Sequence, residues 1–140
     1  MKSLDLDAVT ERDLTRSLLA SPIEEERLQG LKALARIGLE QSMDAIYKCL
    51  SDESWRVRKE AVELFLSLPR ASELASEVIE LLHAEENAGL RNAAVEILVR
   101  LGRHSLPSLH EELSCSDHDV RKFVLDILGE IGDADSLKPM

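Results

Sequence analysis

Aromatic side chains are scarce in this sequence of 140 residues, where they make up only 3%. Glycine and proline are also few, with six and four residues. A β-sandwich or barrel with many turns is therefore disfavoured, and a core must be built from aliphatic side chains. Hydrophobic residues still make up 44% of the sequence, which is enough for a packed core and too much for a disordered chain.

Cysteine is nearly absent as well, with only Cys49 and Cys115 and no Cys-x-x-Cys pair. A small secreted scaffold would be rich in disulfides, so we expect a cytoplasmic protein. The N-terminal segment carries Asp5 and Asp7 where a signal peptide needs an apolar run. No apolar run is long enough to cross a bilayer, so we expect no membrane partner.

Basic residues are outnumbered, with 17 Lys and Arg against 27 Asp and Glu and a net charge of −10. Phosphate contacts need clustered cations, so we expect no nucleic-acid partner. The imbalance lies mainly in residues 71–140, which have 6 basic and 14 acidic residues, against 11 and 13 in residues 1–70. A protein partner with a basic surface should therefore favour the C-terminal half.

An internal repeat is the most informative feature of the sequence. Four segments align on an arginine, with spacings of 31, 33 and 30 residues, at Arg27, Arg58, Arg91 and Arg121. Apolar residues recur six, seven and ten positions after each arginine, which places them on one stripe of an α-helix. The third residue after each arginine is small or branched and would let helices approach closely: Gly30, Ala61, Ala94 and Val124.

A shorter amphipathic segment precedes each long helix, with Leu14 and Leu18 as its apolar stripe in the first repeat. Ser21-Pro22-Ile23-Glu24 is typical of a capping box with proline at the first helical position. Three further residues are predicted N-caps of long helices: Ser54, Asn87 and Asp117. Each long segment closes at glycine or proline, where a helix C-terminus is expected.

Each unit is thus a helix–turn–helix of about 30 residues that cannot bury its stripe alone, whereas stacked units share a continuous core. The sequence predicts an all-α fold, a right-handed α–α superhelix or α-solenoid, in a single domain over residues 1–140. Its repeats are expected at about residues 11–38, 39–69, 70–102 and 103–132, with residues 133–140 as the start of a truncated fifth repeat.

The last repeat has an apolar stripe without an evident cover, formed by Val120, Val124 and Ile127. A solenoid end needs a polar capping face. We therefore expect that the chain is a piece of a longer protein, or that this C-terminal end pairs with a second copy.

The repeated segments resemble HEAT repeats, in the short form found in phycobilisome-lyase-like proteins. The matching residues are Val57–Ala61, Leu90–Ala94, Val120–Val124 and Ile131–Asp133. The resemblance covers roughly residues 11–138 and implies an armadillo-like scaffold for other proteins. HEAT repeats often carry an aspartate six residues before the arginine, where this chain has Asp52 in one repeat and Ser21, Glu85 and Cys115 in the others.

In solenoids of this kind the second helix of each pair usually lines the partner-binding face. The candidate partner-binding residues are Trp55, Lys59, Glu63, Asn92, Glu96, Arg100, Lys122 and Asp126. A solvated face without a partner is the alternative. Trp55 lies in a predicted turn, either as a lid over helix ends or as an exposed interface anchor, and Tyr47 could join it in one aromatic spot.

Acidic residues recur in the turns before the long helices, as in Glu24–Glu26 and Asp117–Asp119. They either favour the helix N-termini through the macrodipole or form a ridge for a basic partner. The arginine column either pairs with such acids or binds anions.

No catalytic, cofactor-binding or metal-binding residue is predicted. The sequence has no P-loop, no nucleophile elbow and no His-Glu-x-x-His motif. Some HEAT-like hydroxylases bind two iron ions through His-Glu pairs that follow the arginine, but the His-Glu pair of this chain is His110-Glu111 on a short helix.

We therefore predict a non-enzymatic protein–protein interaction scaffold or adaptor, which binds its partner on the face of the second helices and on the acidic turn edge. The resemblance leaves two alternatives. One is a bilin lyase-like subunit or accessory factor of an enzyme, which needs an apolar cleft for a tetrapyrrole. The other is a HEAT-like DNA repair glycosylase, which the net charge of −10 disfavours.

Overall fold

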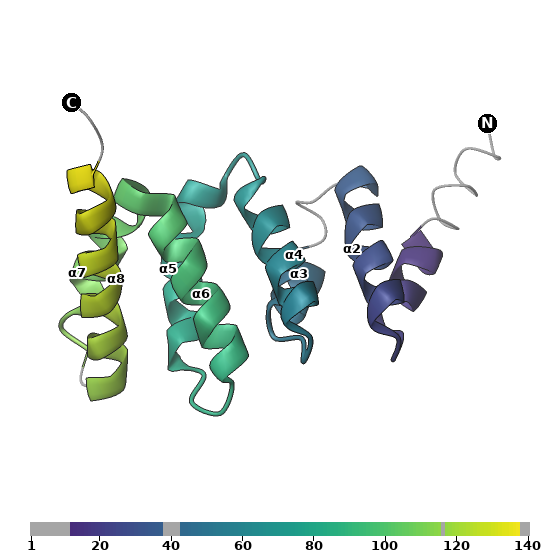
Figure 1. Cartoon of the computed structure of the whole chain (residues 1–140), viewed down its shortest axis with the longest axis horizontal. Helices are drawn as coiled ribbons and strands as arrows, with labels where there is room; N and C mark the ends of the chain where they lie inside the picture. The colour runs from purple at the N-terminus through teal and green to yellow at the C-terminus, as the bar shows by residue number, and fades with distance from the viewer. Residues whose placement is uncertain (1–11, 38–42, 116, 138–140) are drawn as a thin grey trace. The chain divides into compact units, whose positions relative to one another are not determined.

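The computed structural model describes residues 12–37, 43–115 and 117–137, and within these ranges the chain is helical and has no strand (Figure 1). The all-α prediction is confirmed. The chain forms two compact units, Met1–Leu68 and Pro69–Met140. This division falls within one residue of the boundary predicted between the second and third repeats, after residue 69. The single domain stays a prediction, and each unit is described by itself below.

The first unit consists of four described helices: residues 12–19, α2 (Glu24–Ile37), α3 (Met43–Leu50) and α4 (Trp55–Leu66). The long helices α2 and α4 lie side by side, and α3 packs against α4. Leu31, Ile46 and Phe65 are completely buried where these helices meet. The expected boundary between the first and second repeats, at residues 38–39, lies outside the described residues.

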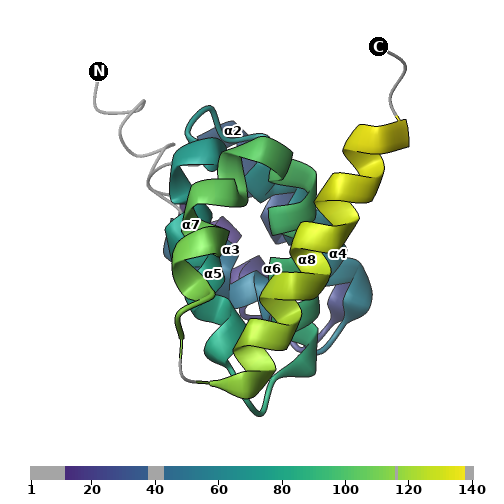
Figure 2. The same cartoon turned by 90° about the vertical axis from the view of Figure 1, so that its left-hand side faces the viewer.

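The second unit is arranged as two layers. Its elements are η2 (Ala71–Leu74), α5 (Ala75–Glu80), η3 (Leu81–His83), α6 (Ala88–Leu101), η4 (Gly102–Ser105), α7 (Leu106–Glu112) and α8 (His118–Leu137). The short helix α5 packs against α7, and the long helix α6 packs against α8 (Figure 2). One layer therefore holds the short helices and the other holds the long ones.

The apolar stripe predicted for the long helices is buried. The residues of the small column are completely buried in three repeats, at Ala61, Ala94 and Val124. Val120 and Ile127 are 2% exposed or less, so the expectation that the last stripe lacks a cover is wrong. Its cover comes from within the unit, since both α6 and α7 pack against α8.

The first short helix differs from its prediction. Leu14 is 59% exposed, whereas Thr15 is 4% exposed and faces the interior.

The start of the second helix also differs from its prediction. The sequence predicts Pro22 at the first helical position, but α2 begins at Glu24 and Pro22 lies outside the helix. The Ser21 hydroxyl accepts a hydrogen bond from the Ile23 amide at 3.0 Å and donates one to the carboxylate of Glu26 at 2.9 Å.

The other predicted caps are confirmed. The side chains of Ser54 and Asn87 accept hydrogen bonds from Val57 and Leu90, and Asp117 accepts from the amide of Val120 at 3.2 Å. These bonds satisfy amide groups that have no partner within the first turn of a helix.

Two glycines at predicted helix ends behave differently. Gly102 has φ +58° and ends α6, as predicted. Gly132 has no positive φ, and α8 continues through it to Leu137. The helix end predicted at Gly132 is therefore wrong, whereas the start of a fifth repeat at residue 133 stays a prediction. Residues 138–140 lie outside the described ranges.

None of the helices in the described part of the chain combines the length and the apolar composition that a bilayer span needs.

Gly30 allows the close approach of α2 to the preceding helix. A Cβ at this position would lie 2.9 Å from Leu19 Cγ and 3.0 Å from the Leu19 backbone nitrogen. Gly129 provides a matched control, because a Cβ there meets nothing within 4 Å. Both glycines lie inside long helices, where alanine is favoured over glycine by about 1 kcal/mol.

We expect Gly30→Ala to lower the free energy of unfolding by about 1–3 kcal/mol, because the backbone of Leu19 must shift. Gly129→Ala should raise it by about 0.5–1 kcal/mol through helix propensity alone. Urea unfolding followed by circular dichroism measures both. An equal stabilisation by the two substitutions would contradict the close contact at Gly30.

Candidate functional site

The turn between α3 and α4 is held by a buried ion pair. Arg27 of α2 donates from Nε to Asp52 Oδ2 at 2.9 Å and from Nη2 to Asp52 Oδ1 at 3.1 Å. The two side chains are only 10% and 12% exposed. The hydrogen bond to Asp52 raises the pKa of Arg27 despite its burial, so the guanidinium stays charged.

Arg27 also joins its own turn, because its Nη1 donates to the Ser21 carbonyl at 2.9 Å. Arg58 makes the same contact one repeat later, from Nη1 to the Asp52 carbonyl at 2.7 Å. Each of these arginines thus binds the carbonyl six residues before it. The carboxylate of Asp52 reaches back to the arginine of the preceding repeat, so the predicted pairing of the column with turn acids is confirmed at Arg27.

The arginines of the second unit have different contacts. The Arg91 guanidinium lies over the ring of Phe123 at 5.3 Å, and its buried Nε has no hydrogen-bond partner among the described residues. Arg121 Nη2 lies 2.6 Å from His118 Nδ1. The four arginines therefore do not form one uniform row of anion-binding groups.

Cys115 takes the turn position that Asp52 occupies in the second repeat. The amide of Asp117 donates to Cys115 Sγ at 3.4 Å, as the amide of Ser54 donates to Asp52 Oδ1 at 2.9 Å. The thiol thus replaces the carboxylate as the acceptor within the turn.

Trp55 is the first residue of α4 and is 68% exposed. It is therefore an exposed side chain rather than a lid over helix ends. Tyr47 packs edge-on against Phe65, with ring centroids 6.1 Å apart, and so contributes to the core instead of an aromatic spot with Trp55. Trp55 borders a groove of about 470 Å³, lined by Pro22, Glu24, Arg27, Glu53, Ser54, Trp55 and Arg56.

Acidic and basic side chains both line this groove. Arg56 Nη1 lies 3.2 Å from Glu24 Oε1 and 3.0 Å from Glu25 Oε1. Glu53 is 89% exposed and lies 3.9 Å from Arg27 Nη2. The acidic turn edge predicted for the first unit therefore lies at the surface and beside Trp55.

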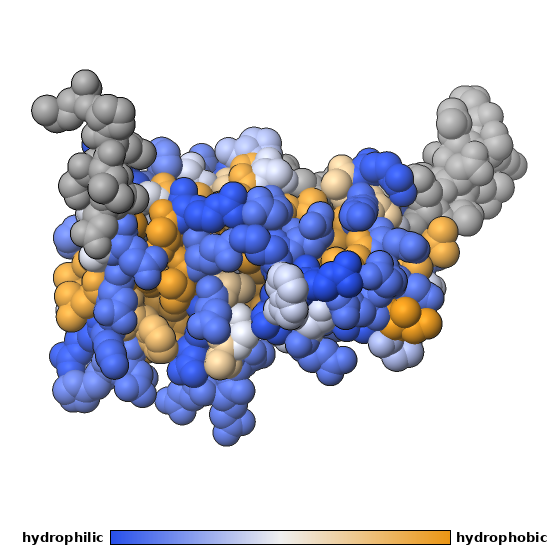
Figure 3. Space-filling model, in the orientation of Figure 1, coloured by the Kyte–Doolittle hydropathy of each residue, from blue (hydrophilic) through white to orange (hydrophobic). Residues whose placement is uncertain are grey.

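The predicted face of the long helices is at the surface in both units. On α4, Trp55, Lys59 and Glu63 follow one another at intervals of four residues, and Lys59 Nζ lies 3.8 Å from Glu63 Oε1. On α6 and α8, Asn92, Arg100, Lys122 and Asp126 are exposed, Glu96 is half-buried, and Arg100 Nη1 lies 3.3 Å from Glu96 Oε2. Hydrophilic residues predominate on this face of the second unit (Figure 3).

Leu125 is an exposed residue that the sequence reasoning missed. It is 58% exposed on α8, between Lys122 and Asp126. Its exposure could have been predicted, because Leu125 lies outside the apolar stripe of its helix.

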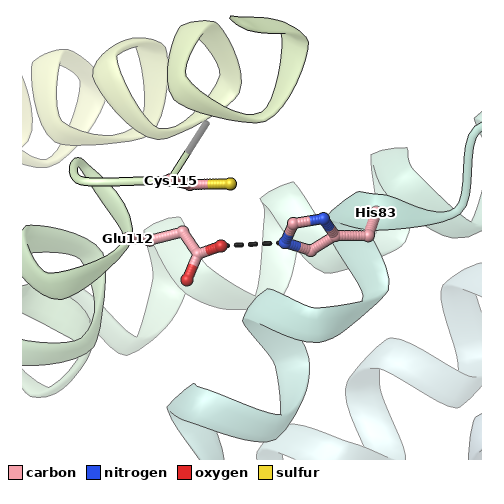
Figure 4. A group of neighbouring side chains, drawn as sticks. All are labelled: His83, Glu112 and Cys115. Carbon is pink, nitrogen blue, oxygen red and sulfur yellow. Dashed lines mark hydrogen bonds and ion pairs between the residues drawn. The ribbon is translucent and has the colours of Figure 1, made fainter. Parts of the chain in front are cut away.

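A group of three side chains in the second unit was also missed. His83 Nε2 lies 2.8 Å from Glu112 Oε1, and the ligand atoms of His83, Glu112 and Cys115 all lie within 4.8 Å of one another (Figure 4). His83 and Glu112 are 29 residues apart, close to one repeat, and this spacing could have brought them together. The sequential pair His110-Glu111, which was not predicted to bind metal, is exposed.

The two cysteines have different surroundings. Cys49 is 5% exposed, and burial raises the pKa of its thiol to about 11. Cys115 is half-buried and lies in the turn after α7. Cys49 is therefore a core residue.

Comparison with known families finds a match to HEAT repeats. The family model for HEAT repeats matches residues 12–98, from the first described helix into α6. A comparison with curated proteins finds no relative. The match confirms the resemblance to HEAT repeats over these residues, whereas the phycobilisome-lyase-like form stays a prediction.

The ion pair of Arg27 and Asp52 allows a direct test of burial. We expect Asp52→Ala to lower the free energy of unfolding by about 3–5 kcal/mol, because it leaves a buried guanidinium uncompensated. Glu53→Ala is the control, since its exposed carboxylate approaches the same arginine and should cost less than about 1 kcal/mol. Chemical unfolding measures both free energies. Similar losses of stability in the two variants would show that the buried ion pair contributes no more than the exposed one.

Proposed function

Because the chain belongs to the HEAT-repeat family, we propose that it is a non-enzymatic module that binds another protein. HEAT repeats generally mediate protein–protein interaction. The observation that carries the proposal for this chain is the exposure of Trp55, which is 68%.

Tryptophan is among the residues most enriched at the energetic centres of interfaces. Trp55 stands at the start of α4, where the helix and the cap at Ser54 fix its backbone. A fixed backbone lowers the entropy that is lost when a partner covers the indole. The exposed indole of Trp55 can therefore be covered by a partner at a small entropic cost.

The charges around Trp55 indicate the chemistry of the partner. Glu24, Glu25 and Glu53 lie at the same edge of the unit, and Glu53 is almost fully exposed. An indole face attracts a cation, and neighbouring carboxylates strengthen the attraction. Arg56 pairs with Glu24 and Glu25, so the exposed Glu53 is the carboxylate that an arginine or lysine of the partner would meet beside the indole.

Lys59 and Glu63 continue the row of Trp55 along α4. Since the two side chains form an exposed ion pair, they contribute little stability and are available to a partner at small cost. We assign them the role of orienting the partner along the helix.

The second unit offers a polar face on α6 and α8. The mixed charges of Glu96 and Arg100 lie on α6, and the exposed Leu125 lies between Lys122 and Asp126 on α8. Because residues 71–140 have 6 basic and 14 acidic residues, this half attracts a basic partner at long range.

Trp55→Ala tests the proposed contact. Peptides selected by display against the full chain should be rich in arginine and lysine, and Trp55→Ala should weaken them by about 30-fold or more, as for an interface hot spot. Leu14→Ala is the matched control, because Leu14 is a large apolar side chain of the same unit and is 59% exposed. Titration calorimetry would measure both, and equal effects of the two substitutions would remove Trp55 from the interface.

Charge reversal tests the electrostatic part. Glu96→Lys with Asp126→Lys should weaken the selected basic peptides, and the loss should shrink at high salt. Arg100→Glu with Lys122→Glu is the opposite control and should strengthen them. Affinities that stay unchanged in both double variants, with the helical circular dichroism intact, would exclude this face.

A further inference from the structure

The group formed by His83, Glu112 and Cys115 lies wholly in the second unit and is separate from the surface around Trp55. His83 is the last residue of η3, and Glu112 is the last residue of α7. In Figure 4, the imidazole and the carboxylate point toward each other, and the thiol of Cys115 extends toward the same space. We propose that these three residues bind a Zn²⁺ ion, with water as the fourth ligand.

The donor set is that of zinc. An imidazole nitrogen, a carboxylate oxygen and a thiolate sulfur are the three protein ligands that Zn²⁺ takes, whereas Mg²⁺ and Ca²⁺ prefer oxygen alone. The thiolate selects further against hard cations. On binding, the Cys115 thiol gives its proton to water, and His83 coordinates through the lone pair of its neutral ring.

The spacing is close to what an ion requires. Zinc bonds of about 2.0–2.3 Å in a tetrahedron separate the ligand atoms by about 3.3–3.8 Å. The atoms of the three residues lie within 4.8 Å of one another, and His83 Nε2 and Glu112 Oε1 lie 2.8 Å apart. Displacements of the ligand atoms by about 1 Å would therefore admit the ion between them.

The backbone holds two of the ligands in a chelating turn. The amide of Cys115 donates to the carbonyl of Glu112 at 2.9 Å, which fixes a Glu-x-x-Cys turn at the end of α7. Ligands three residues apart are typical of zinc sites. The amide of Asp117 donates to Cys115 Sγ at 3.4 Å and stabilises a thiolate there.

The site is open to solvent. The side chains of His83 and Glu112 are 35% and 20% exposed, and Cys115 is half-buried. An ion can therefore enter without unfolding, and one coordination position faces water. Bound zinc would join η3 to the turn after α7.

The test uses the full chain, reduced with a phosphine and freed of metal by a chelator. Competition with a chromogenic zinc indicator should show one equivalent of bound Zn²⁺. His83→Ala, Glu112→Gln and Cys115→Asp should each weaken this binding by about tenfold or more. The aspartate keeps a carboxylate acceptor like that of Asp52 in the turn, so this variant should retain its fold. His110→Ala and Glu111→Gln are matched controls from exposed positions of α7 and should bind as the unchanged chain does.

Two further measurements test whether Cys115 is a ligand. Co²⁺ should produce a thiolate-to-metal charge-transfer band that Cys115→Asp abolishes. Zn²⁺, but not Mg²⁺, should slow alkylation of Cys115, with the buried Cys49 as an internal reference in mass spectrometry. Failure to bind one equivalent, or binding by the three ligand variants that is as tight as that of the unchanged chain, would overturn the proposal. Neither result would bear on binding at Trp55, so the two proposals fail separately.

Discussion

The apolar stripe of each long helix is the constraint on which the rest of the structure depends. Ala94 and Ile97 of α6 and Val124 and Ile127 of α8 are completely buried, because the two helices pack against each other and against the short helices. Once this stripe is turned inward, the opposite face of each helix must be polar and exposed. The turns then place their caps, acids and Trp55 at the surface, so the candidate surfaces are a consequence of the core.

Patterns within a single segment correctly predicted the buried columns, two helix caps and one helix end. The buried columns, the caps at Ser54 and Asn87 and the helix end at Gly102 follow from spacing and residue type within one segment. The short first helix was less predictable, because two leucines define no unique stripe and Leu14 faces solvent. The continuation of α8 through Gly132 was missed because a glycine ends a helix only where it takes a positive φ.

Contacts between repeats were harder to predict. The sequence placed Asp52 six residues before Arg58, whereas the carboxylate binds Arg27 of the preceding repeat. The pair of His83 and Glu112 depends on the lengths of two turns, which no local pattern gives. The surface position of the candidate residues on the long helices was predictable from the helical period, but their contact with a partner stays a prediction.

The replacement of Asp52 by Cys115 at the equivalent turn has a consequence for cooperativity. In a linear array of repeats, stability is the sum of the intrinsic stability of each repeat and the coupling between neighbours. The buried pair of Arg27 and Asp52 adds a directional term to that coupling in the first unit. In the second unit the turn carries a thiol, and Arg91 Nε has no hydrogen-bond partner among the described residues. Coupling between the repeats of the second unit rests more on aliphatic packing. Local unfolding of one repeat should therefore destabilise its neighbour to a different extent in the two units.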